Sequence, residues 1–195
     1  MSREQKHLFI EKLETGIPGF DHISNGGLPK FRTTLVAGTA GSAKTVLATQ
    51  FLAEGIERGE SGVFVTFEET PDAIRRNMLG FSWDIVSWEK EGRWVFVDAS
   101  RQPGEDPIVT GDYDLGALLA RIENAVQQVK AHRVSMDSLG AIFSQLSDSA
   151  TVRNELFRIA SALRRIGVTA VMTAERTEEY GEIARFGVEE FVEDN

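Results

Sequence analysis

Apolar and polar positions follow two different periods along the chain. Short runs rich in β-branched residues predict five strands, at residues 33–37, 62–67, 94–97, 133–137 and 168–173. Stretches in which apolar residues recur every three or four positions predict four helices, at residues 45–58, 71–78, 115–129 and 152–163. Because strands and helices alternate, we expect an α/β fold with a mostly parallel central sheet flanked by helices.

The same pattern indicates a single domain that covers residues 1–195. It contains no internal repeat and no interdomain linker, and 195 residues are enough to bury one core. Residues 1–14 are expected to form an N-terminal arm, and residues 100–114 a polar loop rich in Pro, Gly and Asp. The last segment, VEEFVEDN, is not followed by a predicted strand, so we expect the domain to continue beyond residue 195.

Composition narrows the classes of function. The formal net charge is −9, with 30 acidic and 21 basic residues, which argues against nucleic acid as a partner. No apolar run approaches the ~20 residues of a membrane span, and the charged first residues do not resemble a secretory signal. The sequence has no cysteine for disulfides or thiolate zinc sites, so we expect a cytoplasmic protein. His7, His22 and His132 lack metal-ligand spacing and are expected to make local hydrogen bonds.

The strongest functional motif is GTAGSAKT at residues 38–45, which lies between a predicted strand and a predicted helix. It resembles the P-loop pattern, in which small residues let backbone N–H groups surround phosphate oxygens at a helix N-terminus. Lys44 is expected to reach the β- and γ-phosphates of ATP, and the Thr45 hydroxyl to bind Mg²⁺. The expected nucleotide contacts are Gly38, Thr39, Ala40, Gly41, Ser42, Ala43, Lys44, Thr45 and Val46.

Ala43 departs from the P-loop pattern, which has glycine directly before the lysine. Its methyl group strains the loop if this residue needs a positive φ, and is harmless if the backbone there is already close to helical. Two alternatives to a catalytic P-loop stay open. One is a tight turn rich in Gly and Ala with a surface lysine, and the other is a site that binds nucleotide without catalysis.

Acidic residues follow two of the predicted strands. Asp137 ends one strand and is expected to hold Mg²⁺ through water, unless it only caps the next turn. Glu68 and Glu69 directly follow another strand, at the edge where open α/β sheets bind ligands. We expect Glu68 to orient or deprotonate the attacking water, with Glu69 as the second candidate. The alternative is that this pair only favours the start of the next helix.

Two further groups of residues are less specific. The polar cluster Thr173–Arg176 ends the last predicted strand at the same edge of the sheet. It is a candidate for sensing the γ-phosphate or for contacting a neighbouring subunit, and a solvated strand end is the alternative. Trp83, Trp88 and Trp94 are expected to pack in the core or in an interface rather than to stack on nucleic acid.

The motifs together resemble the RecA-like P-loop ATPases, in which the catalytic glutamate ends the strand next to the P-loop strand. Within them, the chain is similar to the KaiC-type clock ATPases, and to the N-terminal of their two ATPase domains. The resemblance runs from about residue 13 to residue 195, with matching segments such as GIPGFDHISNGGLP, GTAGSAKT, GVFVTFEETP, RVSMDSL and ARFGVEEFVEDN. Phe31 is a departure, because family members often have glycine in the turn after GGLP.

The resemblance implies hexameric rings with ATP between subunits, slow ATP hydrolysis, and a link to timing and to protein partners. It matches Gly41–Thr45, the Glu68–Glu69 pair and Asp137 to the nucleotide and catalytic positions of the family. It also implies that the family domain continues past Asn195, with basic residues that reach a neighbour's phosphate. The competing hypotheses are an ATP-dependent assembly scaffold with little turnover, and a DNA-binding recombinase-like ATPase, which the negative charge disfavours.

Overall fold

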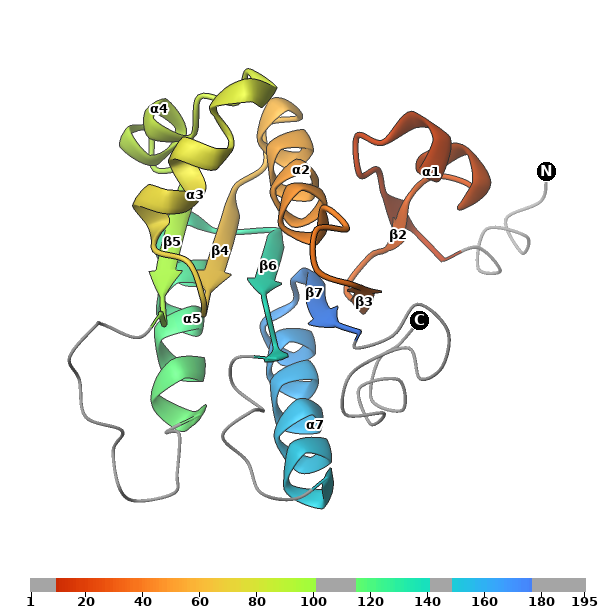
Figure 1. Ribbon diagram of the computed structural model, residues 1–195, viewed down its shortest axis with the longest axis vertical. Coiled ribbons are helices and arrows are strands. Elements are labelled where there is room, and N and C mark those ends of the chain that lie inside the picture. Colours follow the sequence, from red (N-terminus) through yellow and green to blue (C-terminus); the bar gives the residue numbers. More distant parts are fainter. Residues whose placement is uncertain (1–9, 101–114, 141–148, 177–195) are drawn as a thin grey trace, which may run out of the picture.

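A five-stranded parallel sheet forms the centre of the computed structural model, which describes residues 10–100, 115–140 and 149–176. Its strands are β3 (Thr33–Gly38), β4 (Gly62–Thr66), β5 (Trp94–Asp98), β6 (Arg133–Asp137) and β7 (Thr169–Glu175). They lie in the order β3-β7-β6-β4-β5, and each neighbouring pair is parallel (Figure 1). Each predicted strand is present, and the α/β fold of the RecA-like P-loop class is confirmed.

Helices cover both faces of this sheet (Figure 1). The helices on one face are α2 (Lys44–Glu57), α3 (Pro71–Asn77) and α4 (Ile85–Lys90). The helices on the other face are α5 (Leu115–Val129) and α7 (Ser149–Ile166). The apolar spacing does not predict α4 or the short 3₁₀ turn at Leu79–Phe81, because six residues or fewer are too short to show a helical period. No helix in the described part of the chain is long and apolar enough to cross a membrane.

Successive side chains of a strand point to opposite faces of the sheet, and this decides which residues of β4 and β6 lie on the α2 face. In β4, Val63 and Val65 pack with α5 and α7, whereas Phe64 packs on the α2 face. In β6, Ser135 is on the α2 face, where its hydroxyl donates a hydrogen bond of 2.8 Å to the carbonyl of Ala48. This bond explains why a buried strand contains a serine. Asp137 lies two residues further along β6 and therefore faces the same side, toward the start of α2.

Aromatic side chains fill the α2 face near β5. Trp94 is completely buried and stacks on Phe64 and on Trp88, with ring centroids 5.9 and 6.1 Å apart. Trp83 packs against the same cluster and stacks on Phe81. The expectation that the tryptophans serve packing is therefore confirmed for this side of the sheet.

The N-terminal part of the described chain adds a small antiparallel pair, β1 (Lys12–Leu13) with β2 (Leu28–Pro29), and the short helix α1 (Pro18–Ile23). Gly27 has a φ of +98°, and a Cβ there would lie 2.0 Å from the Leu13 carbonyl oxygen, so only glycine fits this pairing. Phe31 adopts a φ of +61°, so the turn into β3 takes the left-handed conformation without a glycine. Most of the loop predicted at 100–114 and the terminal VEEFVEDN segment lie outside the described residues.

The strand order corrects one expectation. The strand that leads to Glu68 is β4, and it follows the P-loop strand β3 in sequence but does not pair with it. Instead, β7 pairs with β3, and β6 pairs with both β7 and β4. The expectation that the glutamate strand lies next to the P-loop strand is therefore wrong, because β7 and β6 both lie between β3 and β4.

Candidate nucleotide-binding site

The P-loop connects the carboxyl end of β3 to the first turn of α2. Residues 39–43 form this connection, and Gly41 has a φ of +76°, a conformation that glycine adopts without strain. The loop is tightened by a backbone hydrogen bond of 3.2 Å from the Ser42 N–H to the Thr39 carbonyl. The positions from Ala40 to Ala43 are exposed to solvent. The described loop therefore presents backbone N–H groups and the positive end of a 14-residue helix to an incoming anion.

Ala43 is the residue just before α2, and it is left-handed, with φ +63° and ψ +26°. Of the two possibilities that the sequence left open, the structure therefore has the strained one. A left-handed backbone costs a residue with a Cβ roughly 1–2 kcal/mol relative to the right-handed form. Ala43 is exposed to solvent, so this cost comes from the backbone conformation.

Lys44 folds back over its own loop. Its Nζ donates hydrogen bonds to the carbonyls of Gly38 and Thr39, at 2.9 and 2.8 Å, and lies 3.5 Å from the Ser42 hydroxyl. The ammonium group thus lies inside the curve of the loop, where it stabilises the loop conformation. This position also puts its positive charge next to the N–H groups that face the solvent.

Asp137 receives hydrogen bonds on both oxygens of its carboxylate. The Thr45 hydroxyl donates to Oδ2 at 2.7 Å, and the Thr173 hydroxyl donates to Oδ1. Asp137 is only 8% exposed and Thr173 is fully buried, so the bond between them is shielded from water, whereas the bond to Thr45 is partly buried. The P-loop threonine and the aspartate at the end of β6 therefore meet, although 92 residues separate them in sequence. A hydroxyl and a carboxylate oxygen are ligands that Mg²⁺ accepts, so this pair fits a magnesium ion.

The two adjacent glutamates have different surroundings. Glu69 is bonded to α3, because the Asn77 side-chain amide donates to its Oε2 at 2.7 Å. Glu68 is exposed, but its carboxyl faces the site, where it accepts a hydrogen bond from the Ser138 hydroxyl. Partial burial of the carboxyl, and next the negative charges of Asp137 and Glu175, raise the pKa of Glu68. Of the two glutamates, Glu68 is the one that the structure brings to Asp137.

Two residues at this edge were not singled out as site residues by the motifs. Ser138 directly follows Asp137, and a hydroxyl next to the strand-end aspartate is the one signal that the sequence offers. Glu175 belongs to the cluster Thr173–Arg176, whose backbone is joined to the P-loop by a hydrogen bond of 3.0 Å from the Arg176 N–H to the Gly38 carbonyl. The cluster therefore lies beside the P-loop.

Comparison with protein families identifies the group to which this site belongs. The family model described as "ATPase: KaiC" matches residues 13–195, which is nearly the whole chain. The chain belongs to the KaiC ATPase family. The matched range includes the P-loop, Thr45 and Asp137, which the structure brings together.

Curated KaiC proteins are similar over nearly all of this chain. The circadian clock protein KaiC3 of Synechocystis sp. is 74% identical over 186 residues, which is 95% of this chain and 37% of that protein. The circadian clock oscillator protein KaiC of Synechococcus elongatus is 52% identical over 195 residues, which is 100% of this chain and 37% of that protein. The chain thus spans about 37% of the length of these KaiC relatives.

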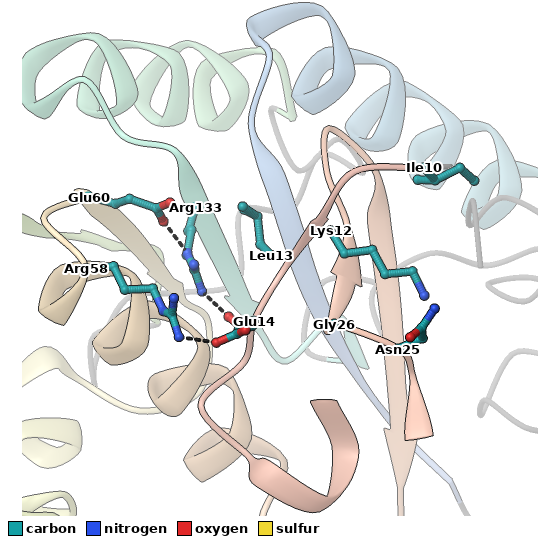
Figure 2. A pocket seen from close by; sticks show the side chains of 9 residues that line it. All are labelled: Ile10, Lys12, Leu13, Glu14, Asn25, Gly26, Arg58, Glu60 and Arg133. Carbon is teal, nitrogen blue, oxygen red and sulfur yellow. Dashed lines mark hydrogen bonds and ion pairs between the residues drawn. The ribbon is translucent and has the colours of Figure 1, made fainter. Parts of the chain in front are cut away.

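A cavity of this KaiC-family chain lies away from the P-loop, at the amino ends of β4 and β6. Its volume is about 670 Å³, and Figure 2 shows charged side chains that face one another across it. Arg133 is 1% exposed and pairs with Glu60, while it also donates to the Glu14 carbonyl at 2.7 Å. Arg58 pairs with the Glu14 carboxylate. The hydrogen bond from Arg133 and the ion pair with Arg58 both hold Glu14, so they join the N-terminal residues to the core.

Proposed function

We propose that this chain binds ATP together with Mg²⁺ at the P-loop and hydrolyses it slowly, as the N-terminal ATPase domain of a KaiC-type clock protein. One observation carries the proposal: the Thr45 hydroxyl and the Asp137 carboxylate are 2.7 Å apart at the start of α2. Thr45 and, through water, Asp137 would hold Mg²⁺, which offsets negative charge on the phosphate oxygens.

In the proposed reaction, the oxygen of a water molecule attacks the γ-phosphorus, and the bond to the β–γ bridging oxygen breaks to release ADP. Glu68 accepts a hydrogen bond from this water and takes its proton as the new bond forms. The raised pKa of Glu68 suits this role, because a more basic carboxylate is a better proton acceptor. Lys44 would exchange its bonds to the Gly38 and Thr39 carbonyls for phosphate oxygens.

Slow turnover follows from the exposure of Glu68. The residue is exposed although its carboxyl is partly buried, so a water bound to it exchanges with bulk solvent and stays in line with the leaving group for only part of the time. The described residues leave the exposed side of the P-loop uncovered, which supports a second subunit as the remaining wall of the site. We therefore propose a homo-oligomeric, hexameric ring with ATP between subunits, located in the cytoplasm.

The names of the relatives suggest the cellular process in which this ATP turnover takes part. The similar proteins from Synechocystis sp. and Synechococcus elongatus are both named as circadian clock proteins. We propose that ATP turnover by this chain is likewise coupled to timing, through clock or signalling proteins that bind the assembled ring. Nucleic acid is a poor candidate partner, because the net charge of −9 repels phosphate.

An assembly scaffold with little turnover is the alternative function, and the left-handed Ala43 favours it. A left-handed alanine directly before Lys44 makes this loop conformation more costly to hold, which weakens the precise placement that catalysis requires more than it weakens binding. Such a protein would bind ATP and assemble, but would release almost no ADP.

The deciding experiment measures Mg²⁺-dependent ATP hydrolysis, ATP binding and assembly for the purified chain and three variants. Lys44→Ala is expected to lose both binding and turnover, and Glu68→Gln to keep binding but lose about 10²–10⁴-fold in turnover. Glu69→Gln is the matched control and is expected to keep turnover, because Asn77 already binds its carboxylate. Turnover lost in Glu69→Gln and kept in Glu68→Gln would reverse the roles. ATP-dependent assembly without turnover in the parent chain would leave the scaffold as the function.

A further inference from the structure

The side chain of Asp137 is held from two sides, and only one of them belongs to the P-loop. Its Oδ2 accepts from Thr45, at 2.7 Å, while its Oδ1 accepts from Thr173. Thr173 is fully buried, so its hydroxyl has no access to bulk water as an alternative partner. The P-loop pattern accounts for Thr45 and Asp137, and leaves Thr173 without a role.

The strand order places Thr173 where it can reach Asp137. Strand β7 lies between β3 and β6, and the last paired residues along β6 and β7 are Met136 and Met172. Thr173 is the next residue of β7 and shares the α2 face with Val171, which is the face that Asp137 also occupies. The Thr173 carbonyl accepts a hydrogen bond of 3.0 Å from the Leu139 N–H. Thr173 thus binds the last residue of β6 through its side chain and the segment after β6 through its backbone.

We propose that Thr173 is a positioning residue, whose hydroxyl fixes Oδ1 of Asp137 so that Oδ2 faces Thr45 and the magnesium ion of a bound nucleotide. The inference rests on the proposed function, and it adds a residue to the metal side of that site. The terminal torsion of an aspartate is broad, so an unrestrained carboxylate rotates easily. Two hydrogen-bond donors, one on each oxygen, define a single orientation of the carboxylate plane.

Mg²⁺-dependent nucleotide binding tests this role without requiring turnover. Binding of a non-hydrolysable ATP analogue to the full chain is measured by calorimetry over a range of Mg²⁺ concentrations, and again in EDTA. Thr173→Val keeps the shape of the side chain and removes the hydroxyl. It is expected to raise the Mg²⁺ concentration for half-maximal binding by about tenfold, in the range found for groups that hold metal ligands. Its affinity for the analogue in EDTA is expected to equal that of the parent.

Two controls separate positioning from a general loss of structure. Thr173→Ser keeps the hydroxyl and is expected to restore the parent's Mg²⁺ dependence. Thr169→Val removes a buried hydroxyl from the opposite end of the same strand, where it accepts a bond of 2.9 Å from the Phe31 N–H. This variant is expected to lower the melting temperature and leave the Mg²⁺ dependence unchanged. If Thr173→Val does not fold, Thr173→Ala takes its place in the comparison.

The outcomes distinguish the inference from the function on which it rests. A parent-like Mg²⁺ dependence in Thr173→Val overturns the inference and leaves the proposed function intact. Equal weakening of binding with Mg²⁺ and in EDTA also overturns it, because a purely structural defect acts on both. If the parent chain itself binds the analogue without any response to Mg²⁺, the proposed function fails first, and the role of Thr173 fails with it.

Discussion

Replacing Ala43 by glycine is expected to stabilise the protein, although glycine usually destabilises a folded chain. Ala43 has φ +63° and ψ +26°, in the left-handed region that a residue with a Cβ occupies at a cost of about 1–2 kcal/mol. Glycine relieves this cost, but it also makes the unfolded chain more flexible, which costs about 0.4–1 kcal/mol. The side chain of Ala43 is exposed, so its removal leaves no cavity in the described structure.

The difference between these contributions lies between about 0 and 1.6 kcal/mol, and the midpoints of the two ranges give a net stabilisation of about 0.8 kcal/mol. For a chain of this size, 1 kcal/mol shifts the melting temperature by about 2–4 °C, so the expected rise is roughly 1–4 °C. Thermal unfolding followed by circular dichroism, supported by urea titration, is sensitive enough to detect it. The measurement is made without nucleotide, because ligand binding would add its own stabilisation.

Ala120→Gly is the matched control for this substitution. Ala120 is exposed in the interior of α5, where the backbone is helical, so glycine there is expected to cost about 1 kcal/mol. The same chemical change is thus expected to have opposite signs at the two positions. If Ala43→Gly lowers the melting temperature as much as Ala120→Gly does, the residue before Lys44 is not left-handed in solution, and the argument for a strained loop is refuted.

Two further predictions concern charged groups. Burial of its carboxyl and the nearby negative charges raise the pKa of Glu68, so its ionisation destabilises the folded state. Glu68→Gln is therefore expected to be more stable than the parent in urea at pH 8, with no difference below the ordinary Glu pKa of about 4.3; an equal difference at both pH values would contradict this. Arg133→Met breaks a buried pair with Glu60 and is expected to cost about 3 kcal/mol, at the low end for buried pairs because Glu60 is partly open to water. Arg165→Met, which removes an exposed partner of Glu123, is expected to leave the urea midpoint nearly unchanged, and a similar loss in both variants would count against the role of burial.

The parts of the fold that depend on local pattern are predictable from the sequence. Each strand of the sheet has enough β-branched residues, and α2, α5 and α7 have enough turns, for periodicity to identify them. The pair β1–β2 has two residues in each strand and depends on Gly27 approaching the Leu13 carbonyl, which is a contact that no period reveals. Short helices such as α4 are not predictable from periodicity either, because packing against Trp94 and its neighbours stabilises them more than their own sequence does.

In the candidate site, too, features that depend on the local sequence are predictable, and features that depend on contacts between distant residues are not. The P-loop, Asp137 and Glu68 are predictable because each lies at the end of a predicted strand or directly after it, and parallel strands end at one edge of a sheet. Whether Ala43 is strained depends on a single backbone torsion, which residue types alone left undecided. The distinction between Glu68 and Glu69 also required the fold, since it rests on the contact of Glu69 with Asn77 in α3.

Thr173 shows most clearly what the sequence alone does not predict. Its contact with Asp137 depends on the order of the strands in the sheet, and knowing where each strand ends does not reveal it. Sequence order suggests that the strand after the P-loop strand is its neighbour, which would leave β7 at a distance from Asp137. In the structure, β7 lies between β3 and β6, so a residue of the last described strand touches the carboxylate at the end of β6. A strand that is inserted between two others supplies side chains to both of them. The metal side of the site is therefore built from three strands or helices that meet only when the sheet has formed, and its geometry is a property of the complete sheet.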